Sequence, residues 1–470
     1  MSIDFPKNWK QVVLEDALDA LIDYRGKTPK KVDKGIPLIT AKVVKSGRIL
    51  PMDEFIADED YESWMVRGIP QISDIVVTTE APLGEVAQIK NANVALAQRI
   101  VTLRGKVDFL ENDFLLFLMQ SDFVQNQLEA RATGSTVKGI KQSELRKIIL
   151  PIPPIVEQKC IGKILSDLDD KIHLNNQINQ TLESIAQAIF KSWFIDFDPV
   201  RAKIAAKQEG KDPELAAMCA MSGKSEEELQ HMSKDDFAEL QATAALFPDE
   251  LMESELGEVP KGWEITNINA VTASIFSGGT PSTKEVTYWN GEIPWLSSGE
   301  TRNKIIVSTE KSITETAVKK SSTKLAIFGD ILIASAGQGH TRGQTSFNAI
   351  ECYINQSIVA LRANDKVSPY WLYYCLEPRY DEMRSVSDSH SSRGSLTTKL
   401  LASMPVILPT QKLVVSFDKV IKPMLAQQVK NAKEIKMLAD TRDALLPKLI
   451  SGDIEVSSSV SETEYEYSAE

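Results

Sequence analysis

The sequence predicts an α+β fold in which two similar mixed α/β domains are each followed by a long helix. The first observation is an internal repeat. KTPKKVDKGIPLI, which begins at Lys27, returns as GTPSTKEVTYWNGEIPWL from Gly279, and QRIVTLRG at Gln98 returns as QSIVALRA at Gln356. The second observation is that, after each copy, apolar residues recur at alternating spacings of three and four, which is the pattern of a heptad seam.

Each copy contains both strand and helix patterns. Short β-branched runs, Ile75–Thr79 in the first copy and Ile331–Ala334 in the second, predict strands. The run ENDFLLFLMQSDFVQNQL predicts a helix that an Asn or Asp residue caps. Proline-marked stretches, LPIPPIVEQK and MPVILPTQK, close the two copies. We therefore predict domains over residues 1–150 and 258–404.

Two long helices are predicted over residues 151–198 and 405–452. Each seam carries polar residues near its middle, Asn175 with Asn179 in the first helix and Gln428 with Asn431 in the second. A strong isolated coiled coil would not place polar pairs there. Two helices of one chain can bury such pairs against each other, where they fix the register. The alternative is that each helix packs on its own domain.

The segment between the halves, residues 199–257, is acidic, rich in helix formers and has no counterpart in the second half. Residues 146–257 carry 12 basic and 20 acidic groups, which is most of the chain's net charge of −12. Ser225, followed by Glu228, predicts a helix start with a capping box. The polar, aperiodic end of the chain predicts a disordered tail over residues 453–470.

Several functional classes find no support in the sequence. The four cysteines form no Cys-x-x-Cys pair, so neither a zinc site nor a disulfide framework is expected. A cytoplasmic location is expected, because no secretion signal and no membrane-spanning run occurs. The glycine-rich SAGQGHTRGQ leads into another strand-like run, whereas a dinucleotide loop opens a helix. No Walker A, methyltransferase or nuclease motif is found. These features favour a binding protein over an enzyme, although a triad assembled in space stays open.

Three polar loops recur in each copy and are candidate DNA-binding elements. Lys, Ser and Thr suit phosphate oxygens, whereas Arg, Gln and His reach base edges. The first-copy candidates are Arg25, Lys27, Thr28, Lys30, Lys31 and Lys34 in the first loop, Thr78 and Thr79 in the second, and Arg131, Thr133, Ser135, Thr136 and Lys138 in the third. The second-copy candidates are Ser277, Thr280 and Lys284, then Gln338, His340, Thr341 and Arg342, then Ser392 and Arg393. Each loop alone also fits a solvated turn, and the recurrence is what favours a function.

An aromatic cluster marks the end of the first long helix. FKSWFIDFDP contains Phe190, Trp193, Phe194 and Phe197. Aromatic side chains dominate the energetics of protein interfaces, so this cluster is a candidate anchor for a partner. The alternative is that it forms local core.

Together these patterns resemble the specificity subunit of type I restriction–modification enzymes. The resemblance covers nearly the whole chain and is most specific in LPIPPIVEQKCIGKILSDLDDKI, AIFKSWFIDFDPVRAK, LFPDELMESELGEVPKGWE and DALLPKLISGDIEV. It implies two target recognition domains, over residues 1–150 and 258–404, joined by two antiparallel spacer helices in a pseudo-two-fold arrangement. Each domain would read one half of a split duplex DNA target, and the helices would fix the gap between the halves.

The resemblance also implies partners. Two modification subunits, which are methyltransferases, and two restriction subunits, which are ATP-dependent translocases and nucleases, would assemble with this chain. S-adenosylmethionine, ATP and Mg²⁺ would belong to those subunits, and this chain would bind no cofactor or metal and catalyse nothing. The resemblance favours the aromatic cluster as a docking site. Two other interpretations stay open: a two-domain scaffold that touches no DNA, and a cytosolic enzyme with its site between two lobes.

Overall fold

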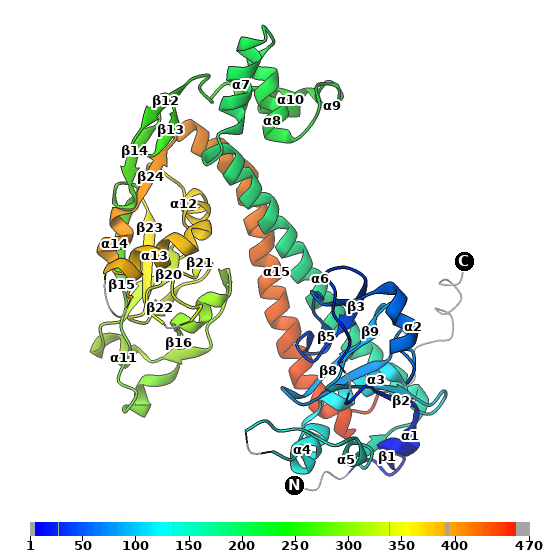
Figure 1. Ribbon diagram of the computed structural model, residues 1–470. Helices are drawn as coiled ribbons and strands as arrows, with labels where there is room; N and C mark the ends of the chain where they lie inside the picture. Colours follow the sequence, from blue (N-terminus) through cyan, green and yellow to red (C-terminus); the bar gives the residue numbers. More distant parts are fainter. Residues whose placement is uncertain (1–4, 27, 135, 338, 391–393, 457–470) are drawn as a thin grey trace. The chain divides into compact units, whose positions relative to one another are not determined.

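The computed structural model describes residues 5–26, 28–134, 136–337, 339–390 and 394–456 (Figure 1). The chain divides into two compact units, residues 1–173 with 436–470 and residues 174–435. Each unit combines sheets with helices, so the predicted mixed α/β class is confirmed. The predicted tail lies outside the described residues from position 457 onward. Within the described ranges, no helix has both the length and the apolar content needed to span a bilayer.

The first unit is built on a four-stranded antiparallel sheet in the order β2-β10-β7-β8. The strands are β2 (Leu18–Asp23), β7 (Ile75–Thr79), β8 (Leu83–Gln88) and β10 (Ile100–Gly105). Ile75 and Val77 face one hydrophobic core, whereas Val76 faces another. Because side chains alternate along a strand, a strand between two cores needs a continuous apolar run, and this explains the sequence of β7.

Smaller elements complete the first unit. A second sheet has the order β6-β3-β9, with β3 (Ile36–Ile39), β6 (Phe55–Ile56) and β9 (Ala95–Leu96). β1 (Lys10–Val13) pairs with β11 (Ile149–Ile152), and β4 (Val44–Lys45) pairs with β5 (Arg48–Ile49). The helices are α1 (Leu14–Ala17), α2 (Tyr61–Trp64), α3 (Asn112–Gln120), α4 (Asp122–Arg131) and α5 (Gln142–Leu145). The single capped helix predicted here is in fact two, α3 and α4. Ser121 interrupts it, and its side chain accepts a bond from Val124 N to cap α4.

The second unit repeats this arrangement. Its main sheet has the order β15-β23-β20-β21-β17, which matches β2-β10-β7-β8 and adds one strand. These strands are β15 (Thr272–Ser277), β17 (Ile305–Ile306), β20 (Ile331–Ala334), β21 (Thr345–Asn348) and β23 (Ile358–Ala363). The smaller sheet β18-β16-β22-β19 contains β16 (Trp289–Leu296), β18 (Lys311–Ile313), β19 (Lys324–Ala326) and β22 (Cys352–Ile354), and β14 (Glu264–Asn267) pairs with β24 (Pro405–Leu408). The helices are α11 (Glu315–Lys320), α12 (Pro369–Leu376), α13 (Tyr380–His390) and α14 (Thr398–Ser403). The predicted duplication is confirmed.

One internal ion pair is duplicated down to its atoms. Arg104 donates from Nε and Nη2 to the two carboxylate oxygens of Asp74, both at 2.8 Å. In the second unit Arg362 contacts Asp330 in the same way, at 2.8 and 2.7 Å. Both carboxylates are fully buried, and a planar guanidinium can satisfy two carboxylate oxygens at once. Both units therefore fix the start of the central strand, β7 or β20, with the same bidentate contact.

Within each unit, the segments of the two long helices, α6 (Ile155–Phe194) and α15 (Gln411–Ser451), run antiparallel and lie side by side (Figure 1). In the second unit, Asn179 Nδ2 donates to the backbone oxygen of Gln428 at 3.2 Å, and Gln428 Nε2 donates to the backbone oxygen of Asn179 at 3.2 Å. Asn431 Nδ2 donates to Asn179 Oδ1 at 2.9 Å, and Asn175 Nδ2 donates to Glu434 at 3.0 Å. The predicted mutual pairing of the polar residues is thus confirmed.

The same helix pair contributes to the first unit. There Arg442 Nη1 of α15 donates to Asp169 Oδ1 of α6 at 2.6 Å. Near the end of α15, Leu449 and Ile450 lie in the hydrophobic core of the first unit together with Leu165 of α6. The last turns of the second long helix are therefore part of the first unit's core.

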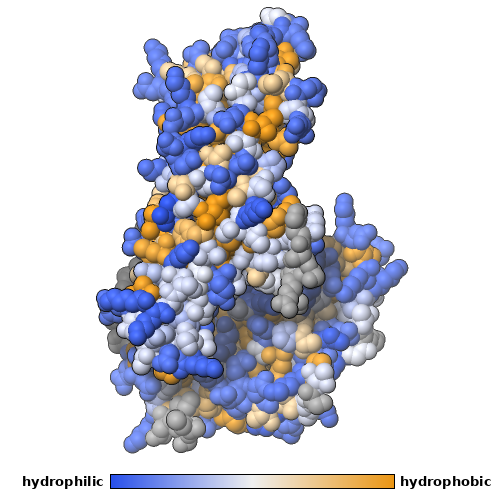
Figure 2. All heavy atoms as spheres, turned by 90° about the vertical axis from the view of Figure 1, so that its left-hand side faces the viewer, coloured by the Kyte–Doolittle hydropathy of each residue, from blue (hydrophilic) through white to orange (hydrophobic). Residues whose placement is uncertain are grey.

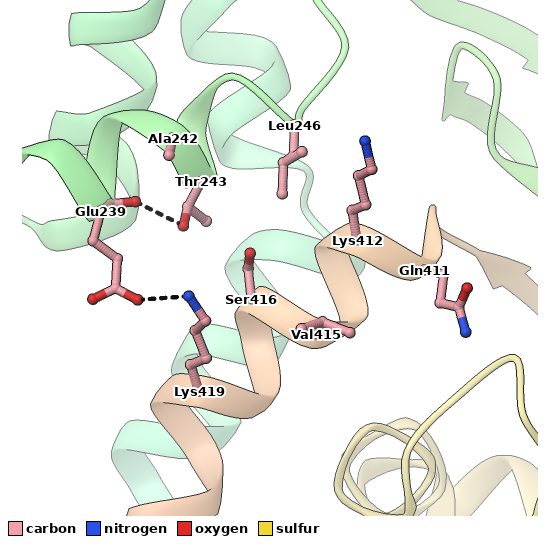
Figure 3. A pocket seen from close by; sticks show the side chains of 9 residues that line it. All are labelled: Glu239, Ala242, Thr243, Leu246, Gln411, Lys412, Val415, Ser416 and Lys419. Carbon is pink, nitrogen blue, oxygen red and sulfur yellow. Dashed lines mark hydrogen bonds and ion pairs between the residues drawn. The ribbon is translucent and has the colours of Figure 1, made fainter.

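The segment between the halves folds into four helices and a hairpin. They are α7 (Asp198–Gln208), α8 (Pro213–Ser222), α9 (Glu226–Gln230) and α10 (Lys234–Ala244), followed by β12 (Leu251–Ser254) and β13 (Gly257–Pro260). The capping box predicted at Ser225 and Glu228 is confirmed. A hollow of about 520 Å³ separates α10 from the first turns of α15, and Lys419 donates to Glu239 across it at 3.0 Å (Figure 3).

The aromatic cluster at the end of α6 packs as local core, which was the alternative interpretation, and its role as a docking anchor stays a prediction. Phe190, Trp193, Phe194 and Phe197 are all buried. They pack against aromatic rings from distant parts of the second unit, with Phe194 5.2 Å from Phe417, Trp193 5.4 Å from Phe247 and Phe197 5.6 Å from Trp263 between ring centroids. Phe190, Phe194 and Phe197 also line a hollow of about 500 Å³, so only their edges are open to a partner.

We predict that Asn431→Ala destabilises the second unit by about 1–3 kcal/mol, because it leaves Asn179 Oδ1 without the donor from Asn431 inside the helix seam. Urea unfolding of the full chain measures this change. Lys430→Ala, at the exposed neighbouring position, is the control and should change stability by less than about 0.5 kcal/mol. Equal losses of unfolding free energy from the two substitutions would contradict the prediction that the buried contact stabilises the second unit.

A second substitution separates core from docking surface. Trp193→Ala should lower the unfolding free energy by about 3–5 kcal/mol, as expected for a large ring removed from a packed core. Ile195→Ala, at a side chain that is 49% exposed, should have little effect. Unchanged stability of the isolated Trp193 variant would return the cluster to the docking interpretation.

Candidate nucleic-acid interface

The three polar loops of the first unit meet at one junction. Arg25 in the first loop donates from Nη2 to the backbone oxygen of Ile140 in the third loop at 3.0 Å. Ile140 N in turn donates to the backbone oxygen of Thr79 in the second loop at 2.9 Å, and Glu80 forms a β-bridge with Gly139. Loops that are more than 50 residues apart in sequence are therefore joined by hydrogen bonds.

A hollow of about 290 Å³ lies beside this junction. Its lining includes Thr28, Lys31, Lys42, Gln98 and Arg99. Three cations around it are each held by a carboxylate: Lys31 by Glu54 at 2.8 Å, Lys42 by Asp53 at 2.7 Å and Arg99 by Glu80 at 2.8 Å. The hydrogen bond between Lys42 and Asp53 raises the pKa of the lysine and lowers the pKa of the carboxyl group, so both stay charged near neutral pH.

The second unit holds the same junction with the same backbone hydrogen bonds. Leu396 N donates to the backbone oxygen of Ser335 at 2.8 Å, as Ile140 N does to that of Thr79. Ser335 N donates to the backbone oxygen of Ser357 at 2.8 Å, as Thr79 N does to that of Arg99 at 2.8 Å. The first loop joins through Thr280, whose hydroxyl donates to Gln356. In both units, the three predicted loops are thus brought together.

Most of the described candidates that are charged or hydroxylic lie at the surface. The exposed candidates are Lys30, Lys34, Thr133, Thr136, Lys138, Thr280, Lys284 and His340. Two more, Ser277 and Thr341, are half-buried. Lys138 is paired with Glu129, and Arg131 lies 3.6 Å from Glu144. Figure 2 shows hydrophilic side chains over most of the face in view, with hydrophobic atoms in separate areas. Five candidates lie outside the described residues: Lys27, Ser135, Gln338, Ser392 and Arg393.

Three candidates point inward, so their predicted contact with DNA does not fit this geometry. Thr78 and Thr79 are almost fully buried, and Thr78 Oγ1 accepts a bond from Glu85 N at 2.9 Å. Arg342 is 7% exposed, and its guanidinium donates to Asp388 at 2.5 Å and to the backbone oxygen of Gly394. Arg342 therefore braces the second loop against the third.

Other residues were missed by sequence reasoning. Gln98, Arg99 and Lys42 line the hollow of the first unit but were not among the candidates. Gln98 had a signal in the sequence, because it repeats as Gln356. In the second unit Arg384 of α13 donates to the backbone oxygen of Gly339 at 2.5 Å, and Tyr380 donates to that of His340 at 2.9 Å. These two side chains hold the glycine-rich loop from outside the predicted loops.

The junctions can bind a polyanion and read base edges, since they combine guanidinium, ammonium, hydroxyl and amide groups on fixed backbones. Among the described residues, no three His, Cys, Asp or Glu side chains form a group that could hold a metal ion.

Comparison with known proteins places both halves of the chain in one family. Residues 6–184 and 260–437 match the family model described as "Type I restriction modification DNA specificity domain". The HindI specificity subunit of Haemophilus influenzae is 31% identical over 378 residues, which are 77% of this chain and 82% of that protein. The MjaIX specificity subunit of Methanocaldococcus jannaschii is 24% identical over 459 residues, which are 96% of this chain and 94% of that protein.

A solved structure supports the fold. The crystal structure of the S subunit of a type I restriction–modification system from M. genitalium covers 97% of this chain and 99% of its own, with a TM-score of 0.58 at 15% identity. The family model matches both halves of the chain, and each half holds one three-loop junction. The chain belongs to the type I restriction–modification DNA specificity family.

Proposed function

We propose that this chain is the DNA-recognition subunit of a type I restriction–modification complex, and that each three-loop junction reads one half of a split duplex target. The observation that carries the proposal is the same backbone junction built twice, with Thr79, Arg99 and Ile140 in one unit and Ser335, Ser357 and Leu396 in the other. A fixed frame with different side chains is what two different half-sequences require.

The long helices supply the spacing in this proposal. α6 and α15 each extend from one unit into the other, and their register is held by buried amide contacts. A pair of helices locked in register has a fixed length, because an α-helix rises about 1.5 Å per residue. The number of unread base pairs between the two half-sequences then follows from these helices.

The chemistry is assigned to partner subunits. Two modification subunits would bring S-adenosylmethionine and methylate the DNA, and two restriction subunits would bring ATP and Mg²⁺ and cut it. The sequence supports a non-catalytic role for this chain, since it carries no recognisable cofactor loop or nuclease motif. A cytoplasmic location follows from a role on chromosomal and invading DNA.

Methylome sequencing of the host, with and without the gene, tests the function. Deletion should abolish methylation at one split motif, and replacing residues 1–150 by the equivalent domain of a relative should change one half of that motif only. Methylation that persists unchanged after deletion would refute the proposal. Absence of salt-sensitive binding to duplex DNA by the purified chain would instead favour the scaffold alternative.

An apolar stripe on α6 is the proposed docking surface for a modification subunit. Leu174, Ile178 and Ile185 are 49%, 36% and 41% exposed, and their spacing of four and seven places them on one side of the helix. Exposed apolar side chains gathered on one face are typical of interaction sites. This stripe is a candidate in addition to the aromatic cluster, whose rings are mostly buried.

Introducing charge into this stripe should block assembly. Ile178→Glu combined with Ile185→Glu should weaken binding of the modification subunit at least tenfold, because two carboxylates would lose their hydration in the interface. Gln180→Glu, exposed on another side of α6, is the control. Native mass spectrometry reads out the complex, and thermal unfolding checks that both variants fold. Equal assembly of the double variant and the control would place the docking surface elsewhere.

A further inference from the structure

The two junctions differ in charge at two pairs of equivalent positions. The carbonyl that accepts from Thr79 N belongs to Arg99, and the carbonyl that accepts from Ser335 N belongs to Ser357. Arg99 and Ser357 therefore occupy the same place in the duplicated frame. The residue after Thr79 is Glu80, whereas the residue after Ser335 is Ala336. A charged pair in the first unit thus stands where the second unit has two small, uncharged residues.

The backbone of Arg99 is held in place, whereas its side chain lies at the surface. Its carbonyl is held by Thr79 N, its φ of 70° lies in the left-handed region, and the next residue, Ile100, pairs with Thr78 in the sheet. The side chain of Arg99 is 53% exposed, and its partner Glu80 is 43% exposed. The fixed backbone of Arg99 thus places its guanidinium beside the hollow that Gln98 and Thr28 also line.

The ion pair between Arg99 and Glu80 is of the kind that exchanges partners easily. Their contact is 2.8 Å long and solvent-exposed, and such pairs add little to stability because water screens both charges. A duplex can therefore replace Glu80 as the partner of Arg99 at small cost. Two parallel N–H groups of a guanidinium match O6 and N7 of guanine in the major groove.

We propose that Arg99 reads a guanine in the half of the target recognised by the first unit, and that Glu80 holds the guanidinium in the free protein. This assignment rests on the proposed function and names the base-reading side chain within it. Glu80 also opposes the wrong DNA. On a duplex without that guanine, the Glu80 carboxylate stays paired with Arg99 and repels nearby phosphates. Binding to a duplex that lacks the correct base is therefore weaker.

The test uses the full chain with its modification subunits and a set of duplexes, each changed at one base pair of the target. Arg99→Ala should remove discrimination at one guanine of the first half by about tenfold or more and leave the second half unaffected. Glu80→Gln should tighten binding to duplexes altered in the first half and so reduce discrimination there. Ser357→Ala, at the equivalent position of the second unit, should leave discrimination in the first half unchanged.

The salt dependence of binding distinguishes a base contact from a phosphate contact. If Arg99→Ala weakens all duplexes alike and lowers the slope of log affinity against log salt by about one, Arg99 contacts a phosphate and the assignment is overturned. Unaltered discrimination at every position would also overturn it. A wild-type complex that prefers no half-sequence at all would refute the proposed function itself, and that result needs no variant. Thermal unfolding confirms that the exposed substitutions leave the fold intact.

Discussion

The reciprocal amide contact between Asn179 and Gln428 is the constraint on which the rest of the structure depends. Each side chain donates to the backbone oxygen of the other residue, and Asn431 adds a third bond from the same seam. Gln428 and Asn431 are almost fully buried, so sliding the helices by one turn would leave these groups without partners inside the protein. Apolar side chains alone would tolerate such a shift more readily. The amides thus select one antiparallel register, and both units are built on the helices that this register holds.

The duplication separates a constant frame from a variable surface. The buried pairs Arg104–Asp74 and Arg362–Asp330 have the same geometry, and the backbone bonds of the loop junctions are the same in both units. The side chains that these junctions present to solvent differ. Because backbone hydrogen bonds hold the frame, an exposed loop residue such as Arg99 can change without disturbing the core. New specificity can therefore arise by surface substitution while the strand order stays fixed.

The sequence was sufficient to predict the repeat, the two long helices and their polar seam, since each rests on periodicity or on self-similarity. It was insufficient where a distant residue decides the outcome. Arg342 points inward because Asp388 and the carbonyl of Gly394, some 50 residues later, bind its guanidinium. The rings near Trp193 are buried because Phe247 and Phe417 come from elsewhere in the chain. Arg99 lies outside the three recurring polar loops, so it was not among the candidates. A single sequence carries no local signal for such tertiary contacts.

The placement of Leu449 and Ile450 in the core of the first unit has a consequence for synthesis on the ribosome. About 280 residues separate them from Leu165, their neighbour in that core. At about 5–20 residues per second, the ribosome needs about 15–60 s to make the intervening chain. During that time the first unit has emerged but lacks its last apolar side chains. The second unit is continuous in sequence and can close once residues up to 435 have emerged, before Leu449 and Ile450 are made. The unit that is translated first is therefore completed last, and its exposed core is the part of the nascent chain most in need of chaperones.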